Sequence, residues 1–91
     1  MTIRWTPTGL RDLESLHAYI AEDSEEAAAA IVEKIDAALK ALQRFPEMGR
    51  KGRVAGTREL VVSPVIAYRV KEEAVEVVAI IHGARRWPNR L

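Results

Sequence analysis

The fold is decided by residues 75–82, whose sequence is VEVVAIIH, because apolar side chains occupy both its odd and its even positions. Side chains of a strand point alternately to the two faces of a sheet, and a strand that is apolar at both parities is typically covered on both faces. We therefore predict a central strand over 75–82.

Two other strands are predicted just before it, over about 57–62 and 65–71. Turn residues occupy positions 63–64 and 71–73, where tight hairpin turns are needed. These three strands should form an antiparallel sheet. Residues 3–5, in which Ile and Trp alternate with a polar neighbour, predict a short first strand.

A first helix is predicted from Thr6 to about Glu22. Thr6 is a favourable N-cap residue, and Pro7 suits the first helical position. The apolar residues that recur at helical spacing are Leu10, Leu13, Leu16 and Ile20.

A second helix is predicted to begin at Asp23, which has capping-box spacing to Glu26. It should stop at Arg44 or Phe45, since Pro46 disfavours helical geometry in the residue before it. Its apolar stripe consists of Ile31, Ile35, Ala38, Leu39 and Leu42. The short connection between the helices favours an antiparallel hairpin.

The predicted order is strand, helix, helix, strand, strand, strand, in a single domain of residues 1–91. Residues 46–56 are rich in Gly and basic residues and are predicted as a loop. The helical hairpin should cover one face of the three-stranded antiparallel sheet, which makes the fold an α+β two-layer structure.

Composition excludes several classes of protein. The chain has no cysteine, so it can form neither a disulfide framework nor a thiolate metal site. Its two histidines are far apart and lack ligand spacing, so no metal or other cofactor is expected. No apolar run approaches the roughly 18 residues of a membrane span, and we expect a cytoplasmic protein.

The net charge of +1 hides an asymmetry between the two halves. Residues 1–43 carry four Lys/Arg and eight Asp/Glu, a balance of −4, whereas residues 44–91 carry ten and five, a balance of +5. Such an asymmetry predicts a basic face that meets nucleic acid or an acidic protein segment. The alternative is that these cations only keep the β half soluble.

Three strand residues could take part in catalysis or anion binding. Arg69 could clamp a phosphate or carboxylate, or it could form an ordinary cross-strand ion pair with Glu59 or Glu76. His82 could act as a general acid or base, or it could be a strand-end histidine bonded to the backbone. Glu59 could act as a base, or it could simply face water.

Other cations are candidates for contact with nucleic acid or another target. They are Arg50, Lys51 and Arg53 in the loop, Arg58 on the next strand, and Arg85 and Arg86 beside Trp87 near the end of the chain. Cations beside a stackable ring are typical of proteins that bind single-stranded nucleic acid. Many solvated loops have the same composition.

Several fragments, in this order and spacing, carry a family resemblance. They are Trp5-Thr6-Pro7, Leu10-Arg11-Asp12-Leu13, Phe45-Pro46-Glu47-Met48-Gly49, Arg58-Glu59-Leu60, Ser63-Pro64, Tyr68-Arg69-Val70 and Ile81-His82-Gly83-Ala84-Arg85-Arg86-Trp87-Pro88. Together they resemble the RelE/ParE superfamily of bacterial toxins, often labelled plasmid stabilisation proteins.

The resemblance implies a toxin of a type II toxin–antitoxin module that arrests growth and is neutralised by its antitoxin. Such an antitoxin binds operator DNA with one part and wraps the toxin with another, flexible part. An amphipathic helix or extended strand of it should cover apolar surface beside the helical hairpin and neutralise the basic surface with acidic residues.

Two activities occur in the superfamily. RelE-like members cut messenger RNA on the ribosome, and this resemblance would make Arg69, Arg85, His82 and Glu59 the catalytic set. ParE-like members inhibit DNA gyrase. The context His82-Gly83-Ala84-Arg85 is more similar to ParE-like chains, and the chain lacks the terminal Tyr or His found in nucleases. We expect a ParE-like toxin, with a RelE-like nuclease or an inactive adaptor as alternatives.

Overall fold

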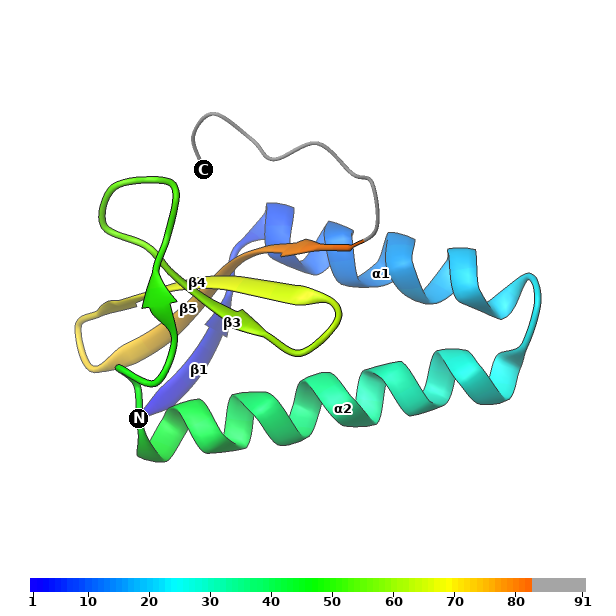
Figure 1. Cartoon of the computed structure of the whole chain (residues 1–91), viewed down its shortest axis with the longest axis horizontal. Coiled ribbons are helices and arrows are strands. Elements are labelled where there is room, and N and C mark those ends of the chain that lie inside the picture. The colour runs from blue at the N-terminus through cyan, green and yellow to red at the C-terminus, as the bar shows by residue number, and fades with distance from the viewer. Residues whose placement is uncertain (83–91) are drawn as a thin grey trace.

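The computed structural model describes residues 1–82 of the chain. Within them the elements follow in this order: β1 (Thr2–Trp5), α1 (Pro7–Ala21), α2 (Glu25–Arg44), β2 (Arg50–Lys51), β3 (Arg58–Val61), β4 (Val65–Lys71) and β5 (Ala74–Ile81). The helices form an antiparallel hairpin against one face of the sheet (Figure 1). The predicted α+β architecture is confirmed, but the observed order contains one strand, β2, that was not predicted.

The sheet is larger than predicted. Its strand order is β1-β5-β4-β3-β2, with β1 parallel to β5 and all other neighbours antiparallel. The predicted antiparallel arrangement holds for β3, β4 and β5, but it omits an edge strand on each side. The prediction of a three-stranded sheet was therefore incomplete.

The edge strand β2 lies inside the segment predicted as a loop. It has only two residues, too few for a period-2 pattern, and bonds from distant residues hold it in place. The Tyr68 hydroxyl accepts from the Gly49 amide at 2.9 Å and donates to the Pro46 carbonyl at 2.7 Å. Arg58 Nη1 donates to the Gly49 carbonyl at 2.8 Å. Local sequence patterns do not reveal such long-range bonds.

The helix boundaries largely agree with the prediction. Thr6 is the N-cap of α1, and Pro7 is its first residue. The N-cap of α2 is Ser24 rather than Asp23, and its side chain accepts from the Ala27 amide at 3.1 Å. Both residue types cap helices well. Here the Ser24 amide bonds to the Ile20 carbonyl at the end of α1, which places Ser24 at the junction.

The main core lies between the helices and the sheet. Its buried members are Leu16, Ile35, Ala38, Leu39, Leu42, Ile66, Tyr68, Val75, Val77 and Ile80. A smaller buried cluster on the opposite sheet face consists of Ala67, Val78, Ala79 and Ile81. β5 is thus buried on both faces, as its sequence predicted.

A β-bulge in β5 breaks the simple alternation of its side chains. Ala67 pairs with Ala79, but the next residue, Tyr68, pairs with Val77, so Val78 is an extra residue. The bulge lets Val77 and Ile80 both face the helices although they are three positions apart. The sequence interpretation, which placed Val78 and Ile80 on one face, missed this shift.

β1 pairs with one edge of β5 only as far as Trp5. Beyond that point, the helix α1 docks onto the same edge of β5. The Thr6 amide donates to the Val77 carbonyl at 3.0 Å. Six residues later, Asp12 Oδ2 accepts from the Ile80 amide at 3.0 Å, and Asp12 is only 7% exposed. Gly9 lies between these contacts, and a Cβ there would be 2.5 Å from the Val77 carbonyl oxygen. Only glycine permits so close an approach.

Gly9→Ala should therefore destabilise the protein, although alanine normally favours a helix by about 1 kcal/mol over glycine. The added methyl group meets backbone rather than a flexible side chain, so α1 must shift, at a cost of about 1–3 kcal/mol. Urea unfolding monitored by circular dichroism measures this change. Thr8→Ala, at the exposed neighbouring position, is the control and should change the free energy of unfolding by less than about 0.5 kcal/mol. Equal or greater stability of Gly9→Ala would contradict this close docking.

Candidate functional site

The sheet face opposite the helices, here called the outer face, carries two carboxylates paired with arginines. The strand register places Glu76 of β5 between Arg4 of β1 and Arg69 of β4. It also places Glu59 of β3 opposite Arg50 of β2. Arg4, Arg50 and Arg69 therefore all lie on the outer face of the sheet.

Glu76 binds both of its neighbouring arginines. Arg4 Nε donates to Glu76 Oε2 at 3.2 Å, and Arg69 Nε donates to Glu76 Oε1. The Glu76 side chain is 12% exposed, whereas those of Arg4 and Arg69 are 45% and 39% exposed. The hydrogen bond from Arg69 is the largest reason that the pKa of Glu76 lies below its ordinary value. Of the two partners considered for Arg69, the structure thus records Glu76.

Glu59 does not face water, contrary to one of the two interpretations of its sequence position. It is 2% exposed, and its Oε1 accepts from Arg50 Nε at 3.1 Å and Arg50 Nη2 at 3.0 Å. Its Oε2 accepts from the Arg53 amide at 2.8 Å. With these three hydrogen bonds, the Glu59 carboxylate anchors the β2–β3 hairpin.

His82 follows β5 and lies beside α1. Its ring is 5.8 Å from that of Tyr19, centroid to centroid, with a tilt of 44° between the ring planes. This contact puts His82 against the helix layer, whereas Glu59 and Arg69 belong to the outer face. Within the described residues, the candidates for catalysis do not converge on one point.

The remaining candidate cations are divided between exposed and structural positions. Lys51 and Arg53 are exposed around the β2–β3 hairpin. Arg58 is half-buried and donates to the carbonyls of Glu47 and Gly49. The predicted candidates Arg85, Arg86 and Trp87 lie outside the residues that the structure describes.

The residue that clamps the α2–β2 connection is Tyr68. Its side chain is fully buried, and burial raises the pKa of its phenol above the ordinary value, so the hydroxyl keeps the proton that it donates to Pro46. A Cβ at Gly49 would come within 2.7 Å of this hydroxyl. Tyr68 and Arg58 together fix the base of the basic hairpin.

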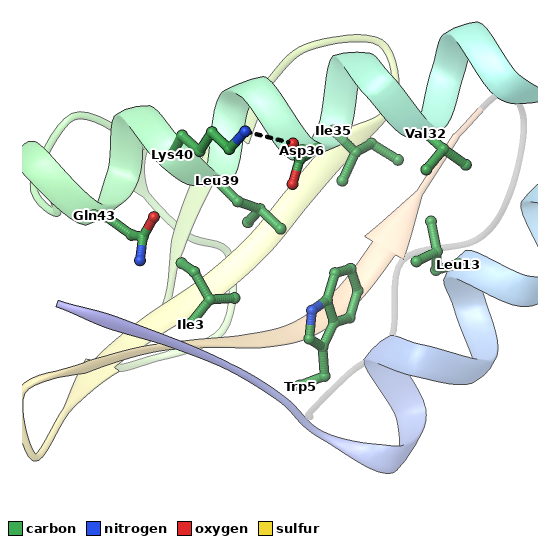
Figure 2. Close-up of a pocket in the computed structure, with 9 residues that line it drawn as sticks. All are labelled: Ile3, Trp5, Leu13, Val32, Ile35, Asp36, Leu39, Lys40 and Gln43. Carbon is green, nitrogen blue, oxygen red and sulfur yellow. Dashed lines mark ion pairs between the residues drawn. The ribbon is translucent and has the colours of Figure 1, made fainter.

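An apolar pocket of about 330 Å³ opens between β1 and the helical hairpin (Figure 2). Its lining residues are Ile3, Trp5, Leu13, Val32, Ile35, Asp36, Leu39, Lys40 and Gln43. Asp36 and Lys40 form an ion pair of 3.1 Å on α2 (Figure 2). Sequence patterns placed Ile3 and Trp5 on a strand, but only the parallel pairing of β1 brings them beside α2.

The part of the chain that is described offers neither a metal site nor a membrane span. No three His, Cys, Asp or Glu side chains among residues 1–82 are grouped as metal ligands. No helix in the same range is long and apolar enough to cross a membrane.

Comparison with known proteins identifies the family. Residues 3–87 match the family described as ParE toxin of type II toxin–antitoxin system, parDE. The chain belongs to this ParE toxin family. It is also 41% identical to the candidate toxin Y4kP of Sinorhizobium fredii over 92 residues, which cover 98% of the chain and 95% of Y4kP. The predicted RelE/ParE superfamily membership is confirmed.

Solved structures of related toxins share the ParE-family fold. A chain of the chromosomal ParDE system of P. aeruginosa has a TM-score of 0.76 and 26% identity, covering 90% of this protein and 95% of that chain. A chain of the RelBE2 toxin–antitoxin complex of Mycobacterium tuberculosis has a TM-score of 0.61 and 27% identity, covering 90% and 96%. The YoeB/ParE toxin of Agrobacterium tumefaciens has a TM-score of 0.62 and 25% identity, covering 91% and 99%.

Replacing Glu76 by Gln should change how the stability of this ParE-family toxin depends on pH. The folded-state pKa of Glu76 lies below its ordinary value of 4.5. The stabilisation from the arginine pairs is therefore complete above that pH and is lost as the pH falls through the lower folded-state pKa. At pH 7, Glu76→Gln should lower the free energy of unfolding by at most about 1 kcal/mol, because both arginines are more than a third exposed.

Urea unfolding at several pH values between about 3 and 7 tests this expectation. The difference between the wild type and Glu76→Gln should shrink below pH 4.5. Glu33→Gln, at an exposed position on α2, is the control, and its difference from the wild type should not follow this pattern. A gap between wild type and Glu76→Gln that widens in acid would contradict the ion-pair assignment.

Proposed function

We propose that this ParE-family toxin acts by binding and inhibiting DNA gyrase rather than by cutting RNA. The observation that carries the proposal is the separation of His82 from Glu59 and Arg69. His82 contacts Tyr19 on α1, whereas the other two lie on the outer face and are ion-paired. The higher TM-score to the ParDE chain than to the RelBE2 chain also supports it.

The chemistry of RNA cleavage explains why this separation matters. A general base must reach the ribose hydroxyl with its proton-accepting atom free, and a cation must reach the phosphate. Glu59 already accepts three hydrogen bonds at 2% exposure. Arg69 shares the negative charge of Glu76 with Arg4. These contacts favour a protein that binds a target over one that assembles a nuclease site from the described residues.

We assign target contact to the β2–β3 hairpin. It exposes Lys51 and Arg53, and the Arg50–Glu59 pair and the Tyr68 clamp hold its base. A rigid base lowers the entropic cost of ordering these cations against an anionic surface. The hairpin lies at the opposite end of the molecule from the turn between the helices (Figure 1).

The antitoxin, in this proposal, docks on the apolar pocket between β1 and the helical hairpin. The pocket is lined by the half-buried side chains of Trp5, Leu13 and Val32, and the Asp36–Lys40 pair lines it as well (Figure 2). Because β1 has a neighbour on one side only, its other edge can accept backbone hydrogen bonds from an added strand. An apolar anchor side chain from the antitoxin would fill the pocket.

A DNA cleavage assay with purified gyrase and supercoiled plasmid tests the target. The toxin should trap gyrase on broken DNA, which appears as linear plasmid after detergent and protease treatment. The double variant Lys51→Ala/Arg53→Ala should trap less, and Arg11→Ala, which changes an exposed cation of α1, should match the wild type. An absence of linear plasmid at saturating toxin, together with cleavage of ribosome-bound mRNA that His82→Ala abolishes, would favour the nuclease alternative instead.

The antitoxin site is tested by a charge placed in the pocket. Val32→Glu should weaken antitoxin binding at least about tenfold, because burying the new carboxylate without a partner costs more than 1.4 kcal/mol. Ala29→Glu adds the same charge one turn earlier on α2, at an exposed position away from the pocket, and should bind as the wild type does. Titration of the chain with its antitoxin by calorimetry measures both. Equal affinities of the two variants would place the antitoxin elsewhere.

A further inference from the structure

Arg4 was not among the residues singled out in the sequence, yet the structure places it in a row with two that were considered. Arg4, Glu76 and Arg69 lie side by side on β1, β5 and β4. Neighbouring strands are about 4.8 Å apart, so the two arginines start about 10 Å from each other across the sheet. In the chain, Glu76 is 72 residues from Arg4 and 7 residues from Arg69.

The two guanidinium groups are fixed in place but only partly used. Each donates a hydrogen bond from Nε to Glu76, and within residues 1–82 the Nη groups of the two arginines have no hydrogen-bond partner. Both side chains are more than a third exposed, whereas the carboxylate between them is 12% exposed. These Nη groups are thus held where an oxyanion can take two parallel hydrogen bonds from one guanidinium.

The charge around this row favours an anion. Two guanidinium groups share one carboxylate, which leaves the row with a balance of +1. Lys71 lies on the same face of β4 as Arg69, two residues further on. Glu59 lies on the same face, opposite Ala67, and is paired with Arg50. Glu72 and Glu73 lie in the turn between β4 and β5, and the Glu73 carbonyl accepts from the Thr2 amide. The two arginines therefore lie across the sheet, one on each side of Glu76.

The positions of Arg4 and Arg69 on different strands determine which kind of anion can contact both. A strand added at the β1 edge could approach Arg4, but Arg69 is two strands further in. A ligand that uses both must cross the face of the sheet, as a polyanionic backbone does. The described aromatic residues lie elsewhere: Trp5 in the apolar pocket, Tyr19 on α1, Phe45 after α2 and Tyr68 in the core. Single-stranded nucleic acid needs such rings to stack its bases, whereas duplex DNA presents mainly phosphates.

We propose that Arg4 and Arg69 form a binding site for the phosphate backbone of duplex DNA, in which Glu76 holds both guanidinium groups in position and limits their affinity. The contact is independent of sequence, because phosphates carry no base information. The proposal holds whichever target the toxin has, since it concerns the bare chain and DNA. It assigns a function to Arg4 that the proposed contacts of the β2–β3 hairpin do not include.

Fluorescence anisotropy of a labelled duplex, titrated with the full chain at several salt concentrations, tests the proposal. Arg4→Ala and Arg69→Ala should each lower the slope of log affinity against log salt by about 0.9. The affinity ratio of wild type to either variant should therefore fall about three- to fourfold between 50 and 200 mM salt. Arg11→Ala removes an exposed cation from the helix layer and should leave the slope unchanged.

Glu76→Gln gives a second measurement in a chain that keeps its shape at this position. It removes the competing negative charge, so duplex affinity at low salt should rise rather than fall. Thermal unfolding of every variant separates loss of binding from loss of folding. The proposal is overturned if Arg4→Ala and Arg69→Ala titrate like Arg11→Ala, or if Glu76→Gln binds no more tightly than the wild type. It is also overturned if the arginine dependence is seen only with single-stranded RNA or only with a poly-glutamate peptide.

Discussion

The docking of α1 onto the open edge of β5 is the contact on which the rest of the structure depends. β1 ends opposite Val77, and beyond that point the backbone of β5 needs other partners. Thr6 and Asp12 supply them, and Gly9 lets the helix come close enough to do so. The edge of an interior strand is thereby closed by a helix, which also fixes the angle at which the hairpin crosses the sheet.

The bulge at Val78 links this docking to the two faces of the sheet. Without the extra residue, Ile80 would lie on the face opposite Val77, and the helix-side core would lose one of its fully buried side chains. Because the shift occurs after Glu76, the ion-paired row stays on the outer face while the end of β5 turns its apolar residues to both layers. His82 then lies beside Tyr19 on α1 rather than beside Arg69.

The predictable features were those encoded within a few neighbouring residues. Residues 75–82 are apolar at both parities, which predicted a strand buried on both faces, and Thr6-Pro7 marked the start of α1. Features that depend on contacts between residues far apart in the chain were either not predicted or left undecided. The parallel pairing of β1, the two-residue strand held by Tyr68, and the position of Arg4 beside Glu76 each join residues that are at least 19 positions apart.

For the same reason, the sequence showed that Arg69 is a cation on a strand but did not show which group it binds. A guanidinium on a strand can bind an external anion or an internal carboxylate, and only the register decides which one it meets. Here the register gives Arg69 and Arg4 the same carboxylate and gives Arg50 the other one. Glu76 and Glu59 thus each hold arginine side chains on the outer face. On this face, the register therefore decides both which arginine each of the two carboxylates binds and where that guanidinium group is held.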